Sequence, residues 1–454
     1  MHVAKFGGSS LADARCFEHV CAIITADDRR RIVVVSAPGK RSKDDTKVTD
    51  LLIRCAEERI AGGDARAELE AVIARYDEIA GNLELPAEVM GAIRGDLEGR
   101  LATPFEDASW FTDLMKAGGE DNSARLMAAA LTKCGPAARY VNPGDAGLLL
   151  SDEAGNAQVL PESYERLAAL AHSEQVVVFP GFFGYTKEGK VVTFPRGGSD
   201  ITGSILARAV GAELYENFTD VNQVRSVDPD IVQDARPIAE LTYREMRELS
   251  YFGFDVFNAE ALEPVARAGI PVAIKHTAEP AAPGTRLVHS RIAPKGEVVI
   301  GIAGADGFAT LYIRKFGMNR IRGFVYDLLG ILYSEGISYE HAPTGIDDIS
   351  VIFRQDQLDE AREARLTQRI RAELGLADDD EVKIERDQAL VMVVGQGMRE
   401  TCGITQTAAG ALAAEGISIQ MLNQGSSELS TMYGVESHQL KAAIRAIYRA
   451  FFER

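Results

Sequence analysis

The segment Lys5-Phe6-Gly7-Gly8-Ser9-Ser10 has residue types and a spacing that suit the binding of a phosphate group. It follows a short apolar strand, and glycines at that place let backbone N–H groups turn toward an anion without interference from a Cβ atom. Lys5, at the end of the strand, would reach the same anion. A glycine pair after a strand is often only a turn, and the G-x-x-x-x-G-K-[ST] spacing of a P-loop is absent. Taken alone, the segment leaves both interpretations open.

A second segment, Phe194-Pro195-Arg196-Gly197-Gly198-Ser199-Asp200, repeats this arrangement before a helix predicted over residues 201–210. Arg196 offers a planar fork suited to a carboxylate, and Asp200 can accept a hydrogen bond from a nearby lysine. Ser and Asp are also the residues that ordinarily cap a helix N-terminus. Two glycine-paired segments in one α/β domain suggest two backbone nests that face a single polyanion.

Two shorter segments are candidates for the same site. Gly118-Gly119-Glu120 precedes a helix predicted over residues 121–131, where an acidic residue also complements the helix dipole. Thr219-Asp220 ends a strand predicted over residues 213–218, and open α/β sheets bind ligands at the carboxyl ends of their strands. Each of these short segments is weak support on its own.

The elements that must position these residues alternate between strands and helices. Residues 3–6 and 32–35 form a β-α-β opening, and residues 50–135 are mainly helical. Further strands are predicted over residues 175–179, 191–194, 213–218 and 272–275. A capping box, Thr242-Tyr243-Arg244-Glu245, starts a helix between the last two. The alternation predicts an α/β fold with a mostly parallel central sheet.

The C-terminal part contains an internal repeat with a constant offset of 80 residues. Gly317-Met318, Gly323, Gly330, Leu332 and Glu335-Gly336-Ile337-Ser338 recur as Gly397-Met398, Gly403, Gly410, Leu412 and Glu415-Gly416-Ile417-Ser418. Each copy reads as a strand, a loop with glycine, an amphipathic helix, and a strand that begins at the Gly-Ile-Ser turn. Two small α+β units are therefore predicted, and a duplicated module without a ligand remains an alternative.

Domain limits follow from a change of composition near Pro280-Ala281-Ala282-Pro283-Gly284. We expect a first domain over residues 1–295 and repeat units over residues 296–380 and 381–454, with strands that can be interleaved between the two units.

The overall composition excludes several classes of function. The 454 residues carry a formal net charge of -18, which opposes extended contact with nucleic acid or an anionic membrane. Five cysteines without a C-x-x-C pair fit a reducing compartment. No apolar run approaches the roughly 20 residues of a membrane helix, and no signal peptide is recognisable. We therefore expect a cytoplasmic protein.

Together these segments resemble the aspartate kinases. The resemblance rests on Lys5-Phe6-Gly7-Gly8-Ser9-Ser10, Thr49-Asp50-Leu51-Leu52, Gly119-Glu120, Arg196-Gly197-Gly198-Ser199-Asp200, Phe218-Thr219-Asp220-Val221 and Pro283-Gly284-Thr285, in this order. It covers nearly the whole chain, and the repeat is similar to the paired ACT domains of that family. The resemblance implies an amino acid kinase fold followed by two ACT-type, ferredoxin-like units.

The resemblance also implies an activity and a set of site residues. The reaction would convert ATP and L-aspartate to ADP and 4-phospho-L-aspartate, the first step of lysine, threonine and methionine biosynthesis. The implied catalytic residues are Lys5, Asp200 and Arg196. The implied aspartate-binding residues are Ser9, Thr49, Glu120 and Arg196, with Arg196 on the α-carboxylate and Glu120 on the α-ammonium. The implied ATP-binding residues are Lys5, Gly7, Gly8, Ser199, Thr219 and Asp220. Mg²⁺ would be held mainly by ATP phosphates and water, without a dedicated protein site.

Regulation by an end-product amino acid, lysine or threonine or both, is implied by the ACT resemblance. The residues implied for the effector are Met318, Phe324, Val325, Glu340 and Thr344. Glu340 could pair with an effector ammonium, although a solvated surface acid is its ordinary role. Unpaired sheet edges in the ACT units make a homo-oligomer the expected assembly.

Two segments depart from the family pattern and leave the nucleotide contacts open. Arg225 and Asp228-Pro229-Asp230 replace an aromatic or aliphatic residue and an Asp-Pro-Arg, and Gly253-Phe254-Asp255-Val256-Phe257-Asn258 replaces a Gly-Ala-Lys-Val-Leu-His. Two alternatives follow: another amino acid kinase, such as one acting on glutamate, or an amino-acid sensor with a degenerate kinase domain. The motifs contain no catalytic histidine, because a carboxylate nucleophile with a pKa of about 3.9 is already ionised at neutral pH.

Overall fold

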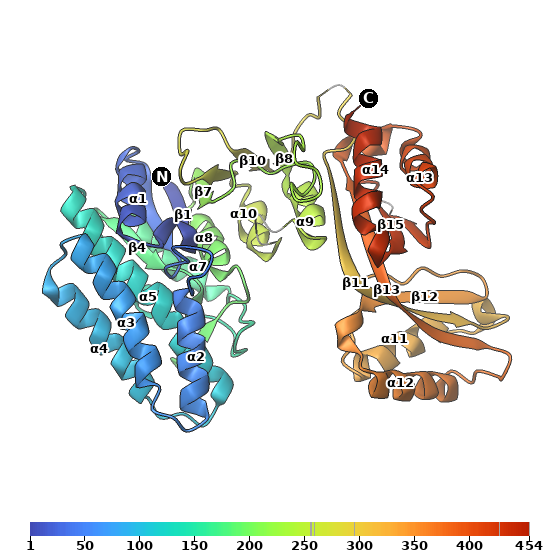
Figure 1. Ribbon diagram of the computed structural model, residues 1–454, viewed down its shortest axis with the longest axis horizontal. Helices are drawn as coiled ribbons and strands as arrows, with labels where there is room; N and C mark the ends of the chain where they lie inside the picture. The colour runs from blue at the N-terminus through green and yellow to red at the C-terminus, as the bar shows by residue number, and fades with distance from the viewer. Residues whose placement is uncertain (255–256, 258, 295, 426, 454) are drawn as a thin grey trace. The chain divides into compact units, whose positions relative to one another are not determined.

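The computed structural model describes residues 1–454 except 255, 256, 258, 295, 426 and 454. The chain divides into two compact units (Figure 1). The first contains Met1–Val224, Pro237–Arg247 and Asp255–Ile292, and the second contains Arg225–Arg236, Glu248–Phe254 and Ala293–Arg454.

An eight-stranded, mostly parallel sheet forms the centre of the first unit, in the order β3-β4-β2-β1-β7-β9-β10-β8. The strands are β1 (His2–Phe6), β2 (Arg30–Val35), β3 (Ala138–Tyr140), β4 (Val176–Pro180), β7 (Leu214–Thr219), β8 (Glu240–Thr242), β9 (Val272–His276) and β10 (Thr285–Val288). Strand β10 runs antiparallel to β9, and the pairs from β3 through β9 are parallel. The predicted α/β fold class is confirmed.

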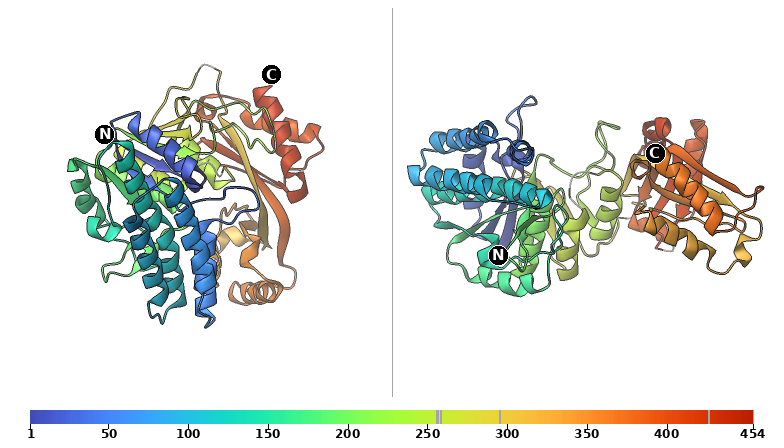
Figure 2. Two further views of the ribbon diagram at one scale, coloured as in Figure 1. Left: turned by 60° about the vertical axis from the view of Figure 1, so that its left-hand side comes forward. Right: turned by 90° about the horizontal axis from the view of Figure 1, so that it is seen from below.

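Helices cover both faces of this sheet. The helices are α1 (Ala14–Thr25), α2 (Val48–Ile60), α3 (Arg66–Asn82), α4 (Ala87–Ala102), α5 (Ala108–Cys134), α6 (Pro143–Ala146), α7 (Glu162–Leu167), α8 (Gly198–Ala209), α9 (Tyr243–Tyr251) and α10 (Leu262–Ala268). Helices α2 to α5 lie side by side, coloured blue to cyan in Figures 1 and 2. Ala4 and Phe6 belong to the core that these helices share with α1. Because side chains alternate along a strand, Lys5 faces α8 instead.

Two local predictions for this unit need correction. Gly118-Gly119-Glu120 does not precede a helix but lies in the middle of α5, so Glu120 has no helix-start dipole role. Neighbours pack closely at both glycines: a Cβ on Gly119 would lie 2.8 Å from Ala37 Cβ, and one on Gly118 would lie 3.2 Å from Arg100 Cδ. Strand β6 (Val191–Thr193) exists as predicted, but it pairs with β5 (Phe183–Tyr185) in a separate antiparallel ribbon.

The start of α9 follows its predicted capping box. The Thr242 backbone N–H donates to Glu245 Oε2 at 2.8 Å, and the Glu245 backbone N–H donates to Thr242 Oγ1 at 3.2 Å. Each residue therefore satisfies a backbone group of the other at the helix N-terminus.

The second unit is built on one antiparallel sheet in the order β12-β11-β13-β15-β14. Its strands are β11 (Gly301–Arg314), β12 (Asp348–Arg354), β13 (Glu381–Val394), β14 (Met421–Gln424) and β15 (Ser430–Glu436), and its helices are α11 (Phe324–Ser334), α12 (Glu360–Glu373), α13 (Ile404–Ala414) and α14 (Leu440–Phe452). The long strands β11 and β13 run between the α11 and α12 end and the α13 and α14 end (Figure 1). Ile302 of β11 packs in the core with α13 and α14, whereas Leu311 packs in the core with α11 and α12. One strand thus serves both cores.

The internal repeat is visible in these elements. Strand β13 and helix α13 begin and end 80 residues after β11 and α11. The strand predicted at the Gly-Ile-Ser turn forms in the second copy as β14. In the first copy that prediction is wrong, since only isolated bridges such as His341↔Ile352 and Thr344↔Ile349 form there. Pro343 lies between them, and proline has no N–H for a ladder hydrogen bond.

Two short segments from within the predicted first domain belong to the second unit. Val227 and Ala235 pack in the same core as α13 and α14. The limits at residues 295 and 380 remain predictions, and Lys295 lies outside the described residues, as do Asp255, Val256 and Asn258 of the departing segment. None of the described helices is both long and apolar enough to span a lipid bilayer.

Candidate active site

Lys5 and Asp200 form the centre of the candidate site. Lys5 Nζ lies 2.6 Å from Asp200 Oδ1, and the two side chains are 10% and 14% exposed. Asn217 Nδ2 also donates to Asp200 Oδ1 at 2.9 Å. Lys5 and Asn217 are register partners on the adjacent strands β1 and β7, so their side chains leave the same face of the sheet. The fold therefore brings the two glycine-paired segments together.

The turn after β1 is packed tightly against the loop after β2. The Gly39 backbone N–H donates to the Gly8 carbonyl at 2.8 Å, and a Cβ on Gly8 would lie 2.8 Å from the Ala37 carbonyl oxygen. Close approach therefore explains Gly8, whereas Gly7 has an extended backbone with φ of -72° and a Cβ there would come no closer than 3.7 Å to Lys5 Nζ. The Val48 N–H donates to the Pro38 carbonyl at 3.1 Å. This bond holds the start of α2 against the loop after β2. Thr49, in the first turn of α2, is half-buried.

Glu120 is a buried carboxylate with an unsatisfied oxygen. The residue is 5% exposed, and its Oε2 atom has no hydrogen-bond partner. Burial raises the pKa of Glu120 to about 7, against the opposing effects of the Ala37 backbone and Lys116. Tyr76 donates its hydroxyl to the Gly119 carbonyl at 2.6 Å, which holds this stretch of α5. A buried carboxylate oxygen without a hydrogen-bond partner is costly, and a cationic ligand group would satisfy it.

The start of α8 presents the second glycine-paired segment. Gly197 adopts φ of +82°, which glycine accepts and other residues rarely do. Gly181, after β4, approaches so closely that a Cβ there would lie 2.5 Å from Ser199 Oγ. Ser199 is therefore buried, whereas Arg196 is exposed on the loop before the helix. The first turn of α8 directs backbone N–H groups and positive potential toward the site.

Phe182 belongs to this region, although it was not predicted from the sequence. It has φ of +77°, a strained conformation for an aromatic residue. Its backbone N–H donates to Thr202 Oγ1 at 3.0 Å, its carbonyl accepts from Phe194 N–H at 2.8 Å, and Lys116 Nζ lies 5.6 Å from its ring centroid. The sequence feature that could have indicated this residue is Gly181-Phe182-Phe183-Gly184, which directly follows an apolar strand.

A pocket of about 420 Å³ opens at the carboxyl ends of β1, β7 and β9. It is lined by Ser9, Ser10, Asp13, Arg15, Cys16, His19, Thr219, Asp220, His276, Thr277 and Ala278. Three predicted site residues, Ser9, Thr219 and Asp220, are thus brought together here. His276 and Thr277 were not predicted, although His276 ends β9 and Thr277 follows it, at the same edge of the sheet.

The five residues predicted to bind an effector have different environments. Met318 and Phe324 are 4% and 3% exposed and pack in the core of the first repeat unit, with half-buried Val325 against it. Glu340 accepts a hydrogen bond from the Tyr251 hydroxyl, and Thr344 is exposed. No ligand contact tests these roles, so they remain predictions.

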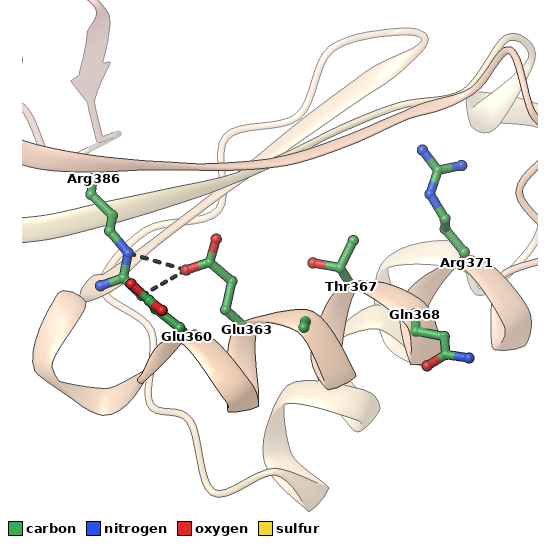
Figure 3. A pocket seen from close by; sticks show the side chains of 7 residues that line it. Glu360, Glu363, Thr367, Gln368, Arg371 and Arg386 are labelled. Atoms are coloured by element: carbon green, nitrogen blue, oxygen red, sulfur yellow. Dashed lines mark hydrogen bonds and ion pairs between the residues drawn. The ribbon is translucent and has the colours of Figure 1, made fainter.

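A second hollow lies beside α12 and has a volume of about 590 Å³ (Figure 3). Arg386 Nη2 contacts Glu363 Oε2 there at 2.6 Å, and Figure 3 shows the Arg371 side chain pointing away from this ion pair. The predicted effector residues do not appear in its lining, which consists of Glu360, Glu363, Ala364, Thr367, Gln368, Arg371 and Arg386. Arg371 Nη2 donates to the Asp380 carbonyl at 3.1 Å, so both arginines of this hollow already have partners.

Metal-ligating clusters are absent from the described part of the chain, where no group of three or more His, Cys, Asp or Glu side chains could hold an ion. A Mg²⁺ ion usually binds through substrate phosphates with one or two carboxylates and several waters. Asp200 beside Lys5 fits that limited protein contribution.

Comparison with known proteins gives family matches over both units. The amino acid kinase family profile matches residues 1–276, and an ACT domain profile matches residues 391–451. Aspartokinase 3 of Bacillus subtilis is 51% identical over 452 residues, which cover 100% of this chain and 99% of that protein.

Solved structures agree with this match. The crystal structure of Clostridium acetobutylicum aspartate kinase is 35% identical, covers 99% of this chain and 100% of that chain, and has a TM-score of 0.83. Escherichia coli aspartokinase III, in complex with aspartate and ADP, is 26% identical over 100% of both chains with a TM-score of 0.81. Its complex with lysine and aspartate is also 26% identical, covers 100% of this chain and 99% of that chain, and has a TM-score of 0.73. The match along the whole chain, in a fold that joins Lys5 to Asp200, shows that this chain belongs to the aspartate kinases of the amino acid kinase family.

Proposed function

We propose that this protein transfers the γ-phosphoryl group of ATP to the side-chain carboxylate of L-aspartate, with Lys5 and Asp200 at the reacting centre. The single observation that carries the proposal is the 2.6 Å contact between these residues, one from each glycine-paired segment. A carboxylate oxygen of aspartate attacks the γ-phosphorus, the bond to the β–γ bridging oxygen breaks, and ADP leaves with the electron pair. No proton moves, so no general base is required.

The main barrier is electrostatic, because an anionic nucleophile must approach a polyanionic phosphate chain. Lys5 would neutralise the transferring group, and the first turn of α8 would add its backbone N–H groups. Asp200 would orient the Lys5 ammonium, and Asn217 holds Asp200 in turn. These residues position charge and do no covalent chemistry.

Aspartate recognition is assigned to residues in the turn after β1, at the start of α2, in the middle of α5 and just before α8. The unsatisfied Oε2 of Glu120 would accept the α-ammonium of the substrate. Arg196 would bind the α-carboxylate with its guanidinium fork, and Thr49 and Ser9 would donate hydroxyl hydrogen bonds. Because Glu120 is buried, this recognition favours a compact amino acid whose ammonium can reach the interior.

ATP is assigned to the carboxyl edge of the sheet. Its phosphates would lie along Gly7, Gly8 and Ser199, and Thr219 and Asp220 would contact the rest of the nucleotide. Mg²⁺ would enter with the phosphates, and it supplies charge neutralisation when bound. Arg225 and Asp230 lie in the segment that packs with the second unit, where Arg225 Nη1 donates to the Ala235 carbonyl at 3.0 Å.

The ACT units are assigned a regulatory role, with lysine, threonine or both as the effector. The Escherichia coli relative was crystallised with lysine, which supports lysine as the first candidate. The residues assigned to the effector are Met318, Phe324, Val325, Glu340 and Thr344. We further propose a homo-oligomer through the ACT units and a cytoplasmic location.

A coupled assay of ADP release, with aspartate and glutamate compared at equal concentration, tests the activity. Aspartate-dependent turnover with ATP and Mg²⁺ is expected, and a preference for glutamate would replace the assignment. Arg196→Lys keeps the charge but loses the fork, so KM for aspartate should rise roughly tenfold or more while KM for ATP changes little. Absence of turnover with either amino acid would favour a sensor without kinase activity.

A further inference from the structure

Thr277, directly after β9, joins three separate elements at the nucleotide edge of the sheet. Its hydroxyl oxygen lies 2.6 Å from Ser10 Oγ and 3.1 Å from the Thr219 carbonyl oxygen. Its backbone N–H donates to the same carbonyl at 2.9 Å, and its own carbonyl accepts from His19 Nε2 at 2.7 Å. These partners belong to the turn after β1, the end of β7 and helix α1.

The directions of the two hydroxyl hydrogen bonds are determined by their partners. A carbonyl oxygen only accepts, so the Thr277 hydroxyl donates to Thr219. The Thr277 proton is then used, and the Ser10 hydroxyl must donate to Thr277 Oγ1. Thr277 is half-buried and lines the pocket, but Ser10 is only 5% exposed. An unpaired hydroxyl at Ser10 would therefore be costly.

We propose that Thr277 is a positioning residue for ATP, whose hydroxyl holds the turn at residues 7–10 at a constant distance from Thr219 and Asp220. This inference rests on the proposed function, in which both segments bind the nucleotide. Thr277 also lines the pocket between them with Ser9, Thr219 and Asp220. The turn at residues 7–10 and the end of β7 come from different parts of the chain; the Gly7 N–H donates to the Phe218 carbonyl at 3.2 Å, and the Thr277 hydroxyl adds a side-chain link.

The choice of threonine follows from the geometry. A valine would keep the branched shape and the backbone N–H to Thr219 but lose both hydroxyl bonds. A serine would keep the hydroxyl and lose only a methyl group. Comparison of Thr277→Val with Thr277→Ser therefore separates the hydrogen bonds from the packing.

The experiment measures MgADP affinity by calorimetry, steady-state KM for ATP and for aspartate, and Tm, for both variants. Thr277→Val should weaken MgADP binding and raise KM for ATP roughly three- to tenfold, as expected for one or two lost hydrogen bonds. KM for aspartate should change less than twofold, on the order of the scatter between independent sites. Thr277→Ser should restore nucleotide affinity to near that of the unaltered protein.

Two further variants complete the test. Ser10→Ala combined with Thr277→Val should weaken nucleotide binding less than the sum of the two single effects, because both remove the same bond. Ser163→Ala is the matched control: its buried hydroxyl also makes two hydrogen bonds, with the backbone of Leu149 at 2.8 and 2.9 Å. It should lower Tm without a change in KM for ATP.

The outcomes distinguish this inference from the proposed function. Equal nucleotide affinity in Thr277→Val and Thr277→Ser, or a loss of Tm alone, would overturn the positioning role and leave the kinase assignment intact. Additive effects of Ser10→Ala and Thr277→Val would also overturn it. An unaltered protein that binds MgADP but releases no ADP with aspartate would overturn the proposed function only. An unaltered protein that binds no nucleotide would refute both.

Discussion

Lys5 Nζ and Asp200 Oδ1 lie 2.6 Å apart, and this contact joins the end of β1 to the first turn of α8. Lys5 precedes one glycine pair and Asp200 follows the other. The strand order places β1 beside β7 at the centre of the sheet. The contact therefore brings two segments that are distant in the sequence to a single candidate anion site.

Replacement of Lys5 by alanine should abolish most of the catalysis. The expected loss is about 10² to 10³ in kcat, the usual effect of removing one preorganised donor to the transition-state charge. Circular dichroism and Tm should show that the fold persists. Lys275→Ala is the matched control, since Lys275 Nζ also pairs with a carboxylate, Glu216, at 3.4 Å and its side chain is 17% exposed. That variant should retain turnover; near-normal kcat in Lys5→Ala would refute the assignment.

Glu120 should give the reaction a pH dependence on the acidic side. Its pKa of about 7 in the free protein means that the carboxyl becomes protonated as the pH falls through 7 and then cannot pair with an ammonium. kcat/KM for aspartate should fall about tenfold per pH unit below this value. In Glu120→Gln the activity should be low throughout and this slope should be absent. A flat profile from pH 8 to pH 6 in the unaltered protein would contradict the role.

The same group should lower stability at high pH. A carboxyl whose pKa is raised by folding binds its proton more tightly in the folded state. The free energy of unfolding therefore falls as the pH rises from about 4.5 to about 7. At pH 8 Glu120→Gln should be more stable than the unaltered protein by up to roughly 3 kcal/mol. At pH 4, below the unfolded pKa, the difference should nearly vanish. Denaturant unfolding at the two pH values measures it, and equal differences at both would show that burial is not the cause.

Two helical glycines should respond in opposite directions to replacement by alanine. Gly95 in α4 has open space at its Cβ position, so Gly95→Ala should stabilise the protein by about 0.5 to 1 kcal/mol. Gly119→Ala would place a Cβ 2.8 Å from Ala37 Cβ, and it should destabilise by about 1 to 3 kcal/mol and raise KM for aspartate by displacing Glu120. Chemical denaturation and the coupled assay measure both. A stabilising Gly119→Ala would show that the close packing against Ala37 is not required.

Regulation should be detectable by titration of lysine and threonine, separately and together, into the activity assay. If Glu340 pairs with an effector ammonium, Glu340→Gln should raise the half-inhibitory concentration about tenfold or more. Tyr251→Phe removes the hydroxyl that donates to Glu340 but keeps the carboxylate, so it should remain sensitive. No response to either amino acid, alone or combined, would remove the regulatory proposal for these two effectors.

Much of the fold was predictable because its elements carry local signals. Continuous β-branched runs such as residues 32–35 predict buried parallel strands, and the Thr242 to Glu245 capping box started a helix where expected. The 80-residue repeat likewise became paired elements with the same offset. The errors occurred where packing overrode a local signal: Gly118-Gly119 looked like a helix boundary but lies inside α5, where Ala37 packs closely against Gly119.

By itself the sequence determined the α/β class, the duplicated C-terminal unit and the residue types of the anion site, since these depend on periodicity, glycine pairs and short-range spacing. Only the tertiary structure decided that Lys5 meets Asp200, that Glu120 keeps a carboxylate oxygen without a partner, and that Thr277 links Ser10 to Thr219. The physical reason is that these relationships depend on strand order and on desolvation. Both arise from contacts between segments far apart in the chain, and no local pattern records them.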